Sequence, residues 1–229
     1  MTEGLVQSPD AEAADTAISV RISEIFYSIQ GESRPAGFPT VFVRLTGCPL
    51  RCGYCDTTYA FYGGSRMTLA AIVAEVRYYQ PRFVCVTGGE PLAQPGCIDL
   101  LRVLTTAGFE VSLETSGALD IGAVPAGVTV VMDIKTPGSG ESQRNRLANI
   151  PVLKERDQVK FVICNRHDYE WSRDFCATHR LLERCSVLFS PSQDDLAARE
   201  LAEWILEDRL QVRFQVQLHK YLWGNEPGH

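Results

Sequence analysis

The sequence lacks the features that mark membrane, secreted and nucleic-acid-binding proteins. It has no run of about 18 apolar residues, which a membrane-spanning helix requires, and no basic stretch followed by an apolar one at its N-terminus. Lys and Arg form no long run and the net charge is -6, whereas nucleic-acid backbones bind clustered cations. We therefore expect a cytoplasmic protein that acts on a small molecule, with neither a nucleic acid nor a membrane as partner.

The chain also lacks the length for a second catalytic domain. Its 229 residues, of which 45% are hydrophobic, fit one globular domain with a sizeable core. Residues 1–17 are small and acidic without periodicity, so we expect a disordered leader followed by a single domain over residues 18–229. Without a secretion signal, the 8 cysteines favour thiols that bind metal over disulfides.

Short β-rich runs alternate with helical patterns from Ile18 onward. The predicted strands span residues 18–28, 40–45, 83–87, 109–114, 128–134, 159–164, 186–190 and 212–218. The predicted helices span residues 68–79, 98–106, 168–182 and 194–207, with Thr68 as an N-cap and Gly108 as a stop signal. This alternation predicts a parallel sheet, whose functional loops leave the carboxyl ends of the strands.

Three cysteines, Cys48, Cys52 and Cys55, follow the second predicted strand at intervals of three and two intervening residues. Three thiolates can hold three irons of a 4Fe-4S cluster and leave the fourth iron open, unlike the four-cysteine ligation of an electron carrier. The alternative is a structural zinc site, which normally takes four Cys or His ligands, and no fourth ligand lies nearby in the sequence. The spacing favours the cluster and leaves zinc open.

A second motif, Thr87-Gly-Gly-Glu-Pro91, follows the third predicted strand. Two glycines let a backbone pass close to a ligand, and the Glu90 carboxylate could receive an ammonium group. In isolation the segment is equally typical of an ordinary Gly-Pro turn.

Together, the two motifs in this order resemble those of the radical S-adenosylmethionine superfamily. The segments at residues 24–32, 43–44, 55–57, 114–117 and 217–221 are similar to the branch of that superfamily that forms 7-carboxy-7-deazaguanine in queuosine biosynthesis. The resemblance extends from Ile22 to His219. It implies a partial, open TIM-like α/β barrel with its site at the carboxyl ends of the strands, and a homodimer.

The resemblance implies conversion of 6-carboxy-5,6,7,8-tetrahydropterin into 7-carboxy-7-deazaguanine with loss of ammonia. One 4Fe-4S cluster and S-adenosylmethionine would supply a 5'-deoxyadenosyl radical that removes a hydrogen from the ring and later receives it back. Mg²⁺ is a further implied cofactor, and flavodoxin or ferredoxin an implied electron donor. No side chain need act as a nucleophile.

The same resemblance assigns roles to individual residues. The cluster ligands are Cys48, Cys52 and Cys55, and the Mg²⁺ ligand is Thr57, which taken alone would be an ordinary loop threonine. The expected S-adenosylmethionine contacts are Gly89, Glu90, Ser116, Asp133, Ile134, Lys135, Ser190, Pro191, Ser192 and Gln193. The expected substrate contacts are Ile29, Gln30, Gly31, Glu32, Arg44, Thr87 and His219, with the Arg44 guanidinium at the substrate carboxylate.

Two departures and two rival functions accompany these expectations. Ser33 stands where many family members have glycine, and the chain has Asp133-Ile-Lys135 where the family often has Ser-Pro-Lys. One rival function is an activating enzyme that places a glycyl radical on a partner protein, and the other is a zinc-stabilised binding module without catalysis. Cys164, Cys176 and Cys185 form no compact loop, so buried thiols are favoured there over an auxiliary cluster.

Overall fold

The computed structural model describes residues 18–224, 226 and 228. One sheet of 9 strands runs in the order β3-β1-β2-β4-β5-β6-β7-β8-β9. The strands are β1 Ser19–Ile29, β2 Pro39–Leu45, β3 Ser65–Thr68, β4 Phe83–Gly88, β5 Glu110–Thr115, β6 Thr129–Asp133, β7 Gln158–Ile163, β8 Ser186–Pro191 and β9 Arg213–Phe214. Because β3 and β9 are the two ends of this order, the sheet is an open barrel.

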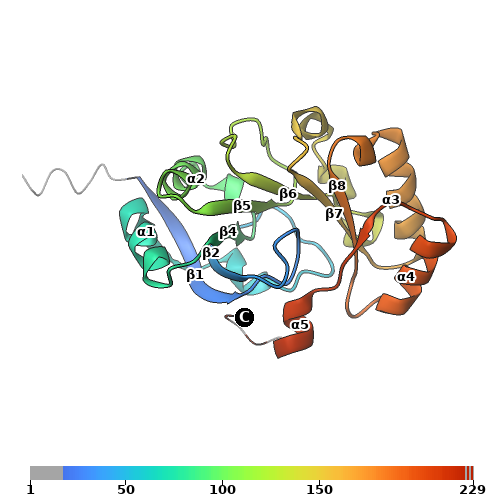
Figure 1. Ribbon diagram of the computed structural model, residues 1–229, viewed down its shortest axis with the longest axis horizontal. Coiled ribbons are helices and arrows are strands. Elements are labelled where there is room, and N and C mark those ends of the chain that lie inside the picture. The colour runs from blue at the N-terminus through green and yellow to red at the C-terminus, as the bar shows by residue number, and fades with distance from the viewer. Residues whose placement is uncertain (1–17, 225, 227, 229) are drawn as a thin grey trace, which may run out of the picture.

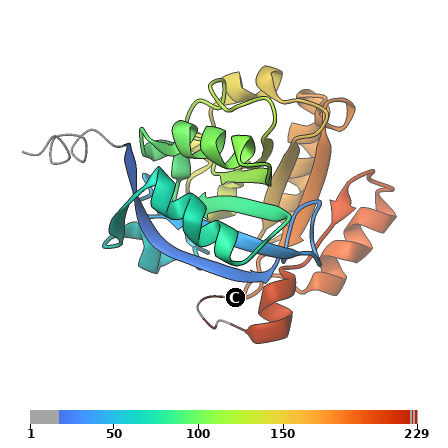
Figure 2. The same ribbon diagram turned by 60° about the vertical axis from the view of Figure 1, so that its left-hand side comes forward.

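Helices cover the outside of the curved sheet. The covering helices are α1 Leu69–Tyr78, α2 Cys97–Thr106, α3 Arg166–Thr178 and α4 Ala198–Glu207, and a fifth helix is α5 Leu218–Trp223. Figures 1 and 2 show α1 to α4 on the convex side, whereas α5 lies apart from them, near the C-terminal end of the chain. None of the described helices is long and apolar enough to cross a membrane.

The central strands are buried on both faces, as parallel strands under helices are. In β4, the residues from Val84 to Val86 are 0% exposed. Val84 and Val86 belong to a hydrophobic core that extends along the sheet from Val20 to Ile205. A smaller cluster of Phe26, Phe42 and Cys85 is separate from this core, and its two phenylalanine rings stack with centroids 4.9 Å apart. Burial on both sides fixes the strands rigidly, so the loops at their ends are held in place.

Seven predicted strands and two predicted helices are confirmed to within two residues. The Thr68 side chain accepts a hydrogen bond from Ala71 N at the start of α1, as an N-cap does. Gly108, after α2, has a positive φ of 94° that ends the helix. These elements were predictable because their apolar periodicity and their end signals agree.

Four boundaries or elements differ from the prediction. The strand predicted over residues 212–218 is reduced to β9, because Gln215 N bonds Phe189 O and the chain then turns so that Leu218 N bonds Gly31 O and begins α5. Helix α3 ends at Thr178, since Arg180 adopts a left-handed φ of 51°. Helix α4 begins at Ala198 instead of residue 194, because residues 192–195 form a turn closed by the Ser192 and Asp195 side chains. The short strand β3 was not predicted.

The sheet is parallel only from β2 onward. Strand β1 pairs antiparallel with both β2 and β3, so the fully parallel sheet expected from the alternation is corrected at this edge. The leader expected over residues 1–17 lies outside the described residues.

Candidate active site

A cavity of about 640 Å³ lies at the carboxyl ends of the parallel strands. Its wall includes the cysteine loop, the segments that follow β4, β5, β6 and β8, parts of β1, β2 and β7 with the loop between β1 and β2, and the C-terminal segment that includes α5. The structure brings most of the predicted site residues to this one cavity: Ile29, Gln30, Glu32, Arg44, Cys48, Cys52, Cys55, Thr57, Thr87, Gly89, Ser116, Asp133, Lys135, Ser192, Gln193 and His219.

The cysteine loop is held by its backbone. Gly47 N bonds Ala60 O at 2.8 Å, and Gly53 N bonds Ser139 O at 3.0 Å. The Arg51 N–H donates to the Glu141 carboxylate at 2.6 Å. The loop is therefore tied both to the segment that follows it and to the segment after β6, and its three half-exposed thiols face one cavity.

The geometry of this loop suits a cluster. No three His, Cys, Asp or Glu side chains converge on a single-ion position anywhere in the described part of the chain. Thiolates that bind a 4Fe-4S cluster attach to different irons, so they need not converge on one point. Burial raises the pKa of Cys48 and raises that of Cys52 to about 11, so their thiolate forms need the positive charge that bound iron supplies.

Glycines let the end of β4 approach this loop closely. A Cβ atom on Gly89 would meet Gly47 O and would lie 2.7 Å from the Cys48 Cβ. Glu90 N bonds Gly47 O at 2.8 Å across the same contact. The Gly-Gly pair therefore allows the end of β4 to pack closely against the cysteine loop, and we call this contact the glycine joint.

Glu90 is the best satisfied carboxylate of the site and is 0% exposed. It accepts hydrogen bonds from the Thr115 hydroxyl, from the Ser116 N–H and hydroxyl, and from Leu92 N. In this arrangement it binds the ends of β4 and β5 together behind the cavity wall. The ammonium partner expected from the sequence would have to displace these donors.

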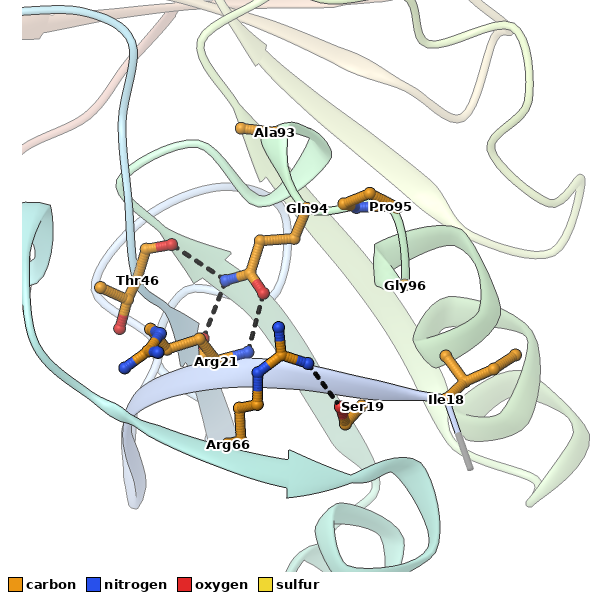
Figure 3. Close-up of a pocket in the computed structure, with 9 residues that line it drawn as sticks. All are labelled: Ile18, Ser19, Arg21, Thr46, Arg66, Ala93, Gln94, Pro95 and Gly96. Carbon is orange, nitrogen blue, oxygen red and sulfur yellow. Dashed lines mark hydrogen bonds between the residues drawn. The ribbon is translucent and has the colours of Figure 1, made fainter. Parts of the chain in front are cut away.

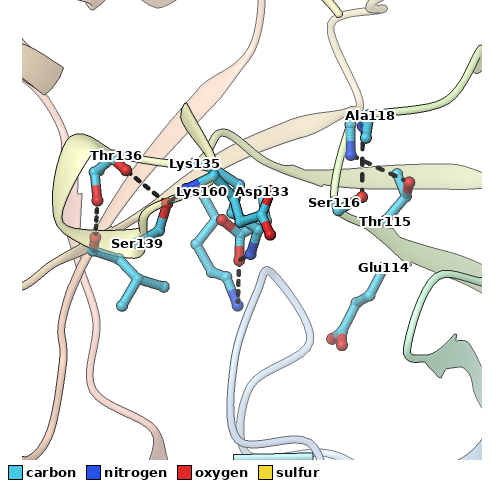
Figure 4. Close-up of polar contacts among 12 residues, drawn as sticks. Glu114, Thr115, Ser116, Ala118, Asp133, Lys135, Thr136, Ser139 and Lys160 are labelled. Carbon is cyan, nitrogen blue, oxygen red and sulfur yellow. Dashed lines mark hydrogen bonds and ion pairs between the residues drawn. The ribbon is translucent and has the colours of Figure 1, made fainter. Parts of the chain in front are cut away.

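The group around Asp133 lies on the side of the cavity formed by β6 and β7 (Figure 4). The Lys135 ammonium is 3.1 Å from Asp133 Oδ2, and the Lys135 side chain is 10% exposed. Asp133 Oδ1 and the hydroxyl of Tyr54, which both lie inside, have no hydrogen-bond partner among the described residues. Tyr54 and Asp133 line the cavity beside Cys52, so these two orphaned oxygens fit a polar ligand bound next to the cysteine loop.

Glu32, from the loop between β1 and β2, also lines the cavity. Its carboxylate accepts hydrogen bonds from the Lys160 ammonium at 2.6 Å and from the Gln217 amide at 2.8 Å. Burial opposes the charge of Glu32, but the adjacent Lys160 outweighs it and holds the Glu32 pKa below its usual value. Glu32 is therefore an ionised acceptor inside the cavity.

Arg44 is, like Glu32, a charged residue among the predicted substrate contacts. It pairs with Glu24 in the register of β1 and β2. Its Nε donates to Glu24 Oε1 at 2.6 Å, and the Tyr59 hydroxyl donates to the same oxygen at 2.6 Å. The guanidinium also lies over the rings of Phe26 and Tyr59, at 5.5 and 5.9 Å from their centroids. The protein thus fixes one edge of the guanidinium, and the terminal nitrogens form no hydrogen bond with any described residue.

Thr87 and Glu114 connect the two sides of the cavity. The Thr87 hydroxyl donates to Glu114 Oε2 at 3.0 Å, and both residues line the cavity from neighbouring strands. His219, from α5, faces the same space, and burial lowers its pKa. At pH 7 its imidazole is therefore neutral and can both donate and accept a hydrogen bond.

Thr57 lies beside a second oxygen donor. Its hydroxyl donates to Asp56 Oδ1 at 2.8 Å, and Lys220 from α5 lies 3.0 Å from Asp56 Oδ2. Burial opposes the charge of Asp56, but Lys220 outweighs it and lowers the Asp56 pKa. Thr57 and Asp56 therefore present hard oxygen ligands at the cavity wall, of the kind that Mg²⁺ prefers.

Five predicted site residues lie behind the cavity wall. These are Gly31, Glu90, Ile134, Ser190 and Pro191. A Cβ on Gly31 would collide with the His219 ring, so this glycine allows α5 to approach. Ile134 and Ser190 are each 1% exposed, and their side chains belong to the interior. These residues shape the site through packing.

Other lining residues were not among those predicted. Asp56, Glu114, Lys160, Gln217 and Lys220 all face the cavity. The sequence does contain a signal for Lys160, because a lone lysine in the run Val159-Lys-Phe-Val-Ile163 would have to be buried with a partner. The side chains of Asp56 and Lys220 belong to loop and tail segments without periodicity, and only the fold brings them together.

A second cavity, of about 600 Å³, lies where β1, β3 and the start of α2 meet (Figure 3). Its central contact is the Gln94 amide, which bonds the backbone N and O of Arg21 and the backbone O of Thr46. Among the residues that the structure describes, those that line it include no Cys, His, Asp or Glu. Its polar contacts fasten the edge of the sheet to the loop after β4.

Comparison with known proteins shows which ones this chain is similar to. The sequence profile of the radical SAM superfamily matches residues 42–137, which include the cysteine loop and the Gly-Gly-Glu motif. The 7-carboxy-7-deazaguanine synthase of Chlorobaculum tepidum is 46% identical over 212 residues, which cover 91% of this chain and 96% of that protein. The protein of the same name from Koribacter versatilis is 41% identical over 90% of this chain and 98% of its own length.

A solved structure agrees with the fold. The crystal structure of QueE from Escherichia coli superposes with a TM-score of 0.74 and covers 93% of this chain and 100% of its own. At 23% sequence identity, this likeness supports the open barrel architecture and nothing finer.

Proposed function

Because the chain belongs to the 7-carboxy-7-deazaguanine synthase family of radical S-adenosylmethionine enzymes, we propose that it converts 6-carboxy-5,6,7,8-tetrahydropterin into 7-carboxy-7-deazaguanine with loss of ammonia. The observation that supports this most is that three thiols, a fixed arginine and an ionised glutamate line one cavity. The relatives that match nine tenths of this chain are named as this synthase, which disfavours the glycyl-radical activating enzyme.

The family implies one 4Fe-4S cluster and S-adenosylmethionine. When bound, this pair supplies a 5'-deoxyadenosyl radical. Cys48, Cys52 and Cys55 would hold the cluster, and the orphaned oxygens of Tyr54 and Asp133 leave hydrogen bonds free for S-adenosylmethionine beside it. The other residues proposed on this side of the cavity are Gly89, Ser116, Lys135, Ser192 and Gln193.

The pterin would occupy the side of Glu32 and Arg44. The terminal nitrogens of Arg44 would bind its carboxylate, since Nε is already committed to Glu24. The ionised Glu32 would accept hydrogen bonds from the N–H groups of the aminopyrimidinone edge. Thr87 and neutral His219 would bind the polar atoms between these ends, while Phe26 and Phe42 supply an apolar surface.

Mg²⁺ is proposed on the oxygen of Thr57. The adjacent Asp56 carboxylate supports this proposal, and so does the sequence, in which Asp56 and Thr57 directly follow Cys55. A metal there would lie between the cluster loop and an anionic substrate. Removal of Mg²⁺ by a chelator that leaves the cluster intact should then raise the KM for the pterin.

Several partner and location expectations stay predictions. They are a homodimer, a flavodoxin or ferredoxin as the electron donor, a cytoplasmic location, and one domain over residues 18–229. The chemistry inside the cavity needs one electron delivered to the cluster, which the natural donor supplies in the cell and a chemical reductant can supply in an assay.

The decisive test is product formation. We expect the anaerobically reconstituted, reduced protein to form 7-carboxy-7-deazaguanine from the carboxytetrahydropterin, S-adenosylmethionine and Mg²⁺. Iron and acid-labile sulfide should be present at about four each per chain, as a single 4Fe-4S cluster requires. Cleavage of S-adenosylmethionine without this product would reject the substrate, and zinc without sulfide would reject the enzyme class.

A further inference from the structure

Lys160 is a buried cation to which the proposed chemistry gives no role. It lies in the middle of β7, between Val159 and Phe161, which are both 0% exposed, and its own side chain is 13% exposed. The sheet register places it opposite Asp133 on β6. Its ammonium group is 2.6 Å from Glu32 Oε2 and 3.6 Å from Asp133 Oδ2. One ammonium is therefore shared by the carboxylates of Glu32 and Asp133, and Figure 4 shows Lys160 beside Asp133.

The two carboxylates depend on Lys160 to different degrees. Asp133 has a second cation, because Lys135 Nζ lies 3.1 Å from the same oxygen. Glu32 receives hydrogen bonds from the amides of Gln217 at 2.8 Å and Gln215 at 3.4 Å, but within the described residues it forms no second ion pair with Lys or Arg. Loss of the Lys160 charge would thus leave Glu32 as a buried, unpaired anion.

We propose that Lys160 is a positioning residue that anchors on Asp133 and holds the Glu32 carboxylate ionised and aimed at the pterin. This inference rests on the proposed function and adds to it a residue that determines substrate binding. The aminopyrimidinone edge of a pterin offers N–H donors, and an ionised, oriented carboxylate accepts from such a group, whereas a protonated one is itself a donor. A protonated or displaced Glu32 would present a competing donor or an empty position.

The charges around the pair agree with this role. Burial opposes ionisation of both groups, yet Lys160 lowers the pKa of Glu32, and Glu32 with Asp133 raises the pKa of Lys160. The other charged and titratable groups that act on the pair are Asp56, Glu114, Lys135 and His219. Glu114 and His219 come from the opposite sides of the cavity, and neither touches Glu32 through a hydrogen bond.

The test compares Lys160→Met with Lys154→Met, the same substitution at a lysine outside the cavity lining. Binding of the pterin and of S-adenosylmethionine would be measured separately by calorimetry on the oxidised holoenzyme, where no turnover occurs. For Lys160→Met, we expect the Kd of the pterin to rise about tenfold to a hundredfold, with cluster content unchanged. The Kd of S-adenosylmethionine should change less than about threefold, since Lys135 still balances Asp133. Lys160→Arg should recover most of the pterin affinity, and Lys154→Met should match the wild type.

A double-mutant cycle protects the test from a general loss of stability. In a Glu32→Gln background, which removes the partner charge, Lys160→Met should add little further loss of pterin affinity. Additive losses, an unchanged pterin Kd, or equal weakening of both ligands would overturn the role of Lys160. Failure of the wild-type protein to form the deazaguanine product would instead overturn the proposed function, so the two failures are distinguishable.

Discussion

The two sides of the cavity are built by different kinds of contact. The side of the cysteine loop is held by backbone bonds and glycine joints, such as Glu90 N to Gly47 O and the approach of Gly89 to Cys48. The side of Glu32 is held by side-chain contacts between distant segments, since the ion pair of Glu32 with Lys160 spans 128 positions and the hydrogen bond of Glu32 with Gln217 spans 185. A backbone frame suits a cofactor that every catalytic cycle needs, and ion pairs suit recognition of one substrate.

The largest effect is expected from removal of a cysteine ligand on the cofactor side of the cavity. Cys52→Ala should abolish cluster assembly and all product formation, because two thiolates cannot hold the cluster with one open iron. Iron and sulfide analysis with a product assay measures this. Cys176→Ala, on α3 and 2% exposed, is the matched control and should keep a full cluster. Loss of iron in the control would contradict the assignment of Cys176 as a buried thiol.

The next largest effect is expected at the glycine joint. Gly89→Ala would place a methyl group against Gly47 O and 2.7 Å from the Cys48 Cβ, so the cysteine loop must shift. We expect cleavage of S-adenosylmethionine to fall about a hundredfold, because a shift of about 1 Å near the reacting atoms costs that much. Gly122→Ala, where the nearest atom belongs to the flexible Asp120 side chain, should be nearly silent. A fully active Gly89→Ala protein would disprove the glycine joint.

A change on the other side of the cavity should leave the cofactor chemistry intact. Arg44→Lys keeps the charge but loses the fork that binds Glu24 and a carboxylate together. The KM for the pterin should rise about tenfold while the cluster content and the affinity for S-adenosylmethionine stay the same. Steady-state kinetics with a binding measurement checks this. If S-adenosylmethionine binding fell equally, the two sides would not be separable.

The smallest effect concerns Ser33, in the loop between β1 and β2. Its φ of 63° lies in the left-handed region, and its buried hydroxyl has no hydrogen-bond partner among the described residues. Ser33→Gly should raise the free energy of unfolding by roughly 0.5–1 kcal/mol, since relief of backbone strain exceeds the entropy that glycine adds to the unfolded chain. Denaturant unfolding measures the change, and a destabilised variant would contradict the strain.

The same contrast explains what the sequence could predict. The cysteine loop and Gly89 belong to contiguous motifs with their own spacing, so the sequence alone was enough to identify them. Continuous apolar runs likewise located the central strands, because a strand that is buried on both faces is apolar at nearly every position. The partners of Glu32 and Asp56 were missed, because Lys160 and Lys220 reach them only through the curvature of the sheet and the turn into α5. The strand predicted over residues 212–218 was too long because the turn into α5 likewise depends on contacts with a distant segment.

The central claim is that the three-cysteine loop leaves an iron open toward the cavity that also holds the pterin. The most direct measurement is the electron paramagnetic resonance spectrum of the anaerobically reduced protein, before and after S-adenosylmethionine and then the pterin are added. We predict a 4Fe-4S signal that changes when S-adenosylmethionine binds and changes again with the pterin. A signal that neither ligand alters, or the absence of an iron–sulfur signal, would contradict the account.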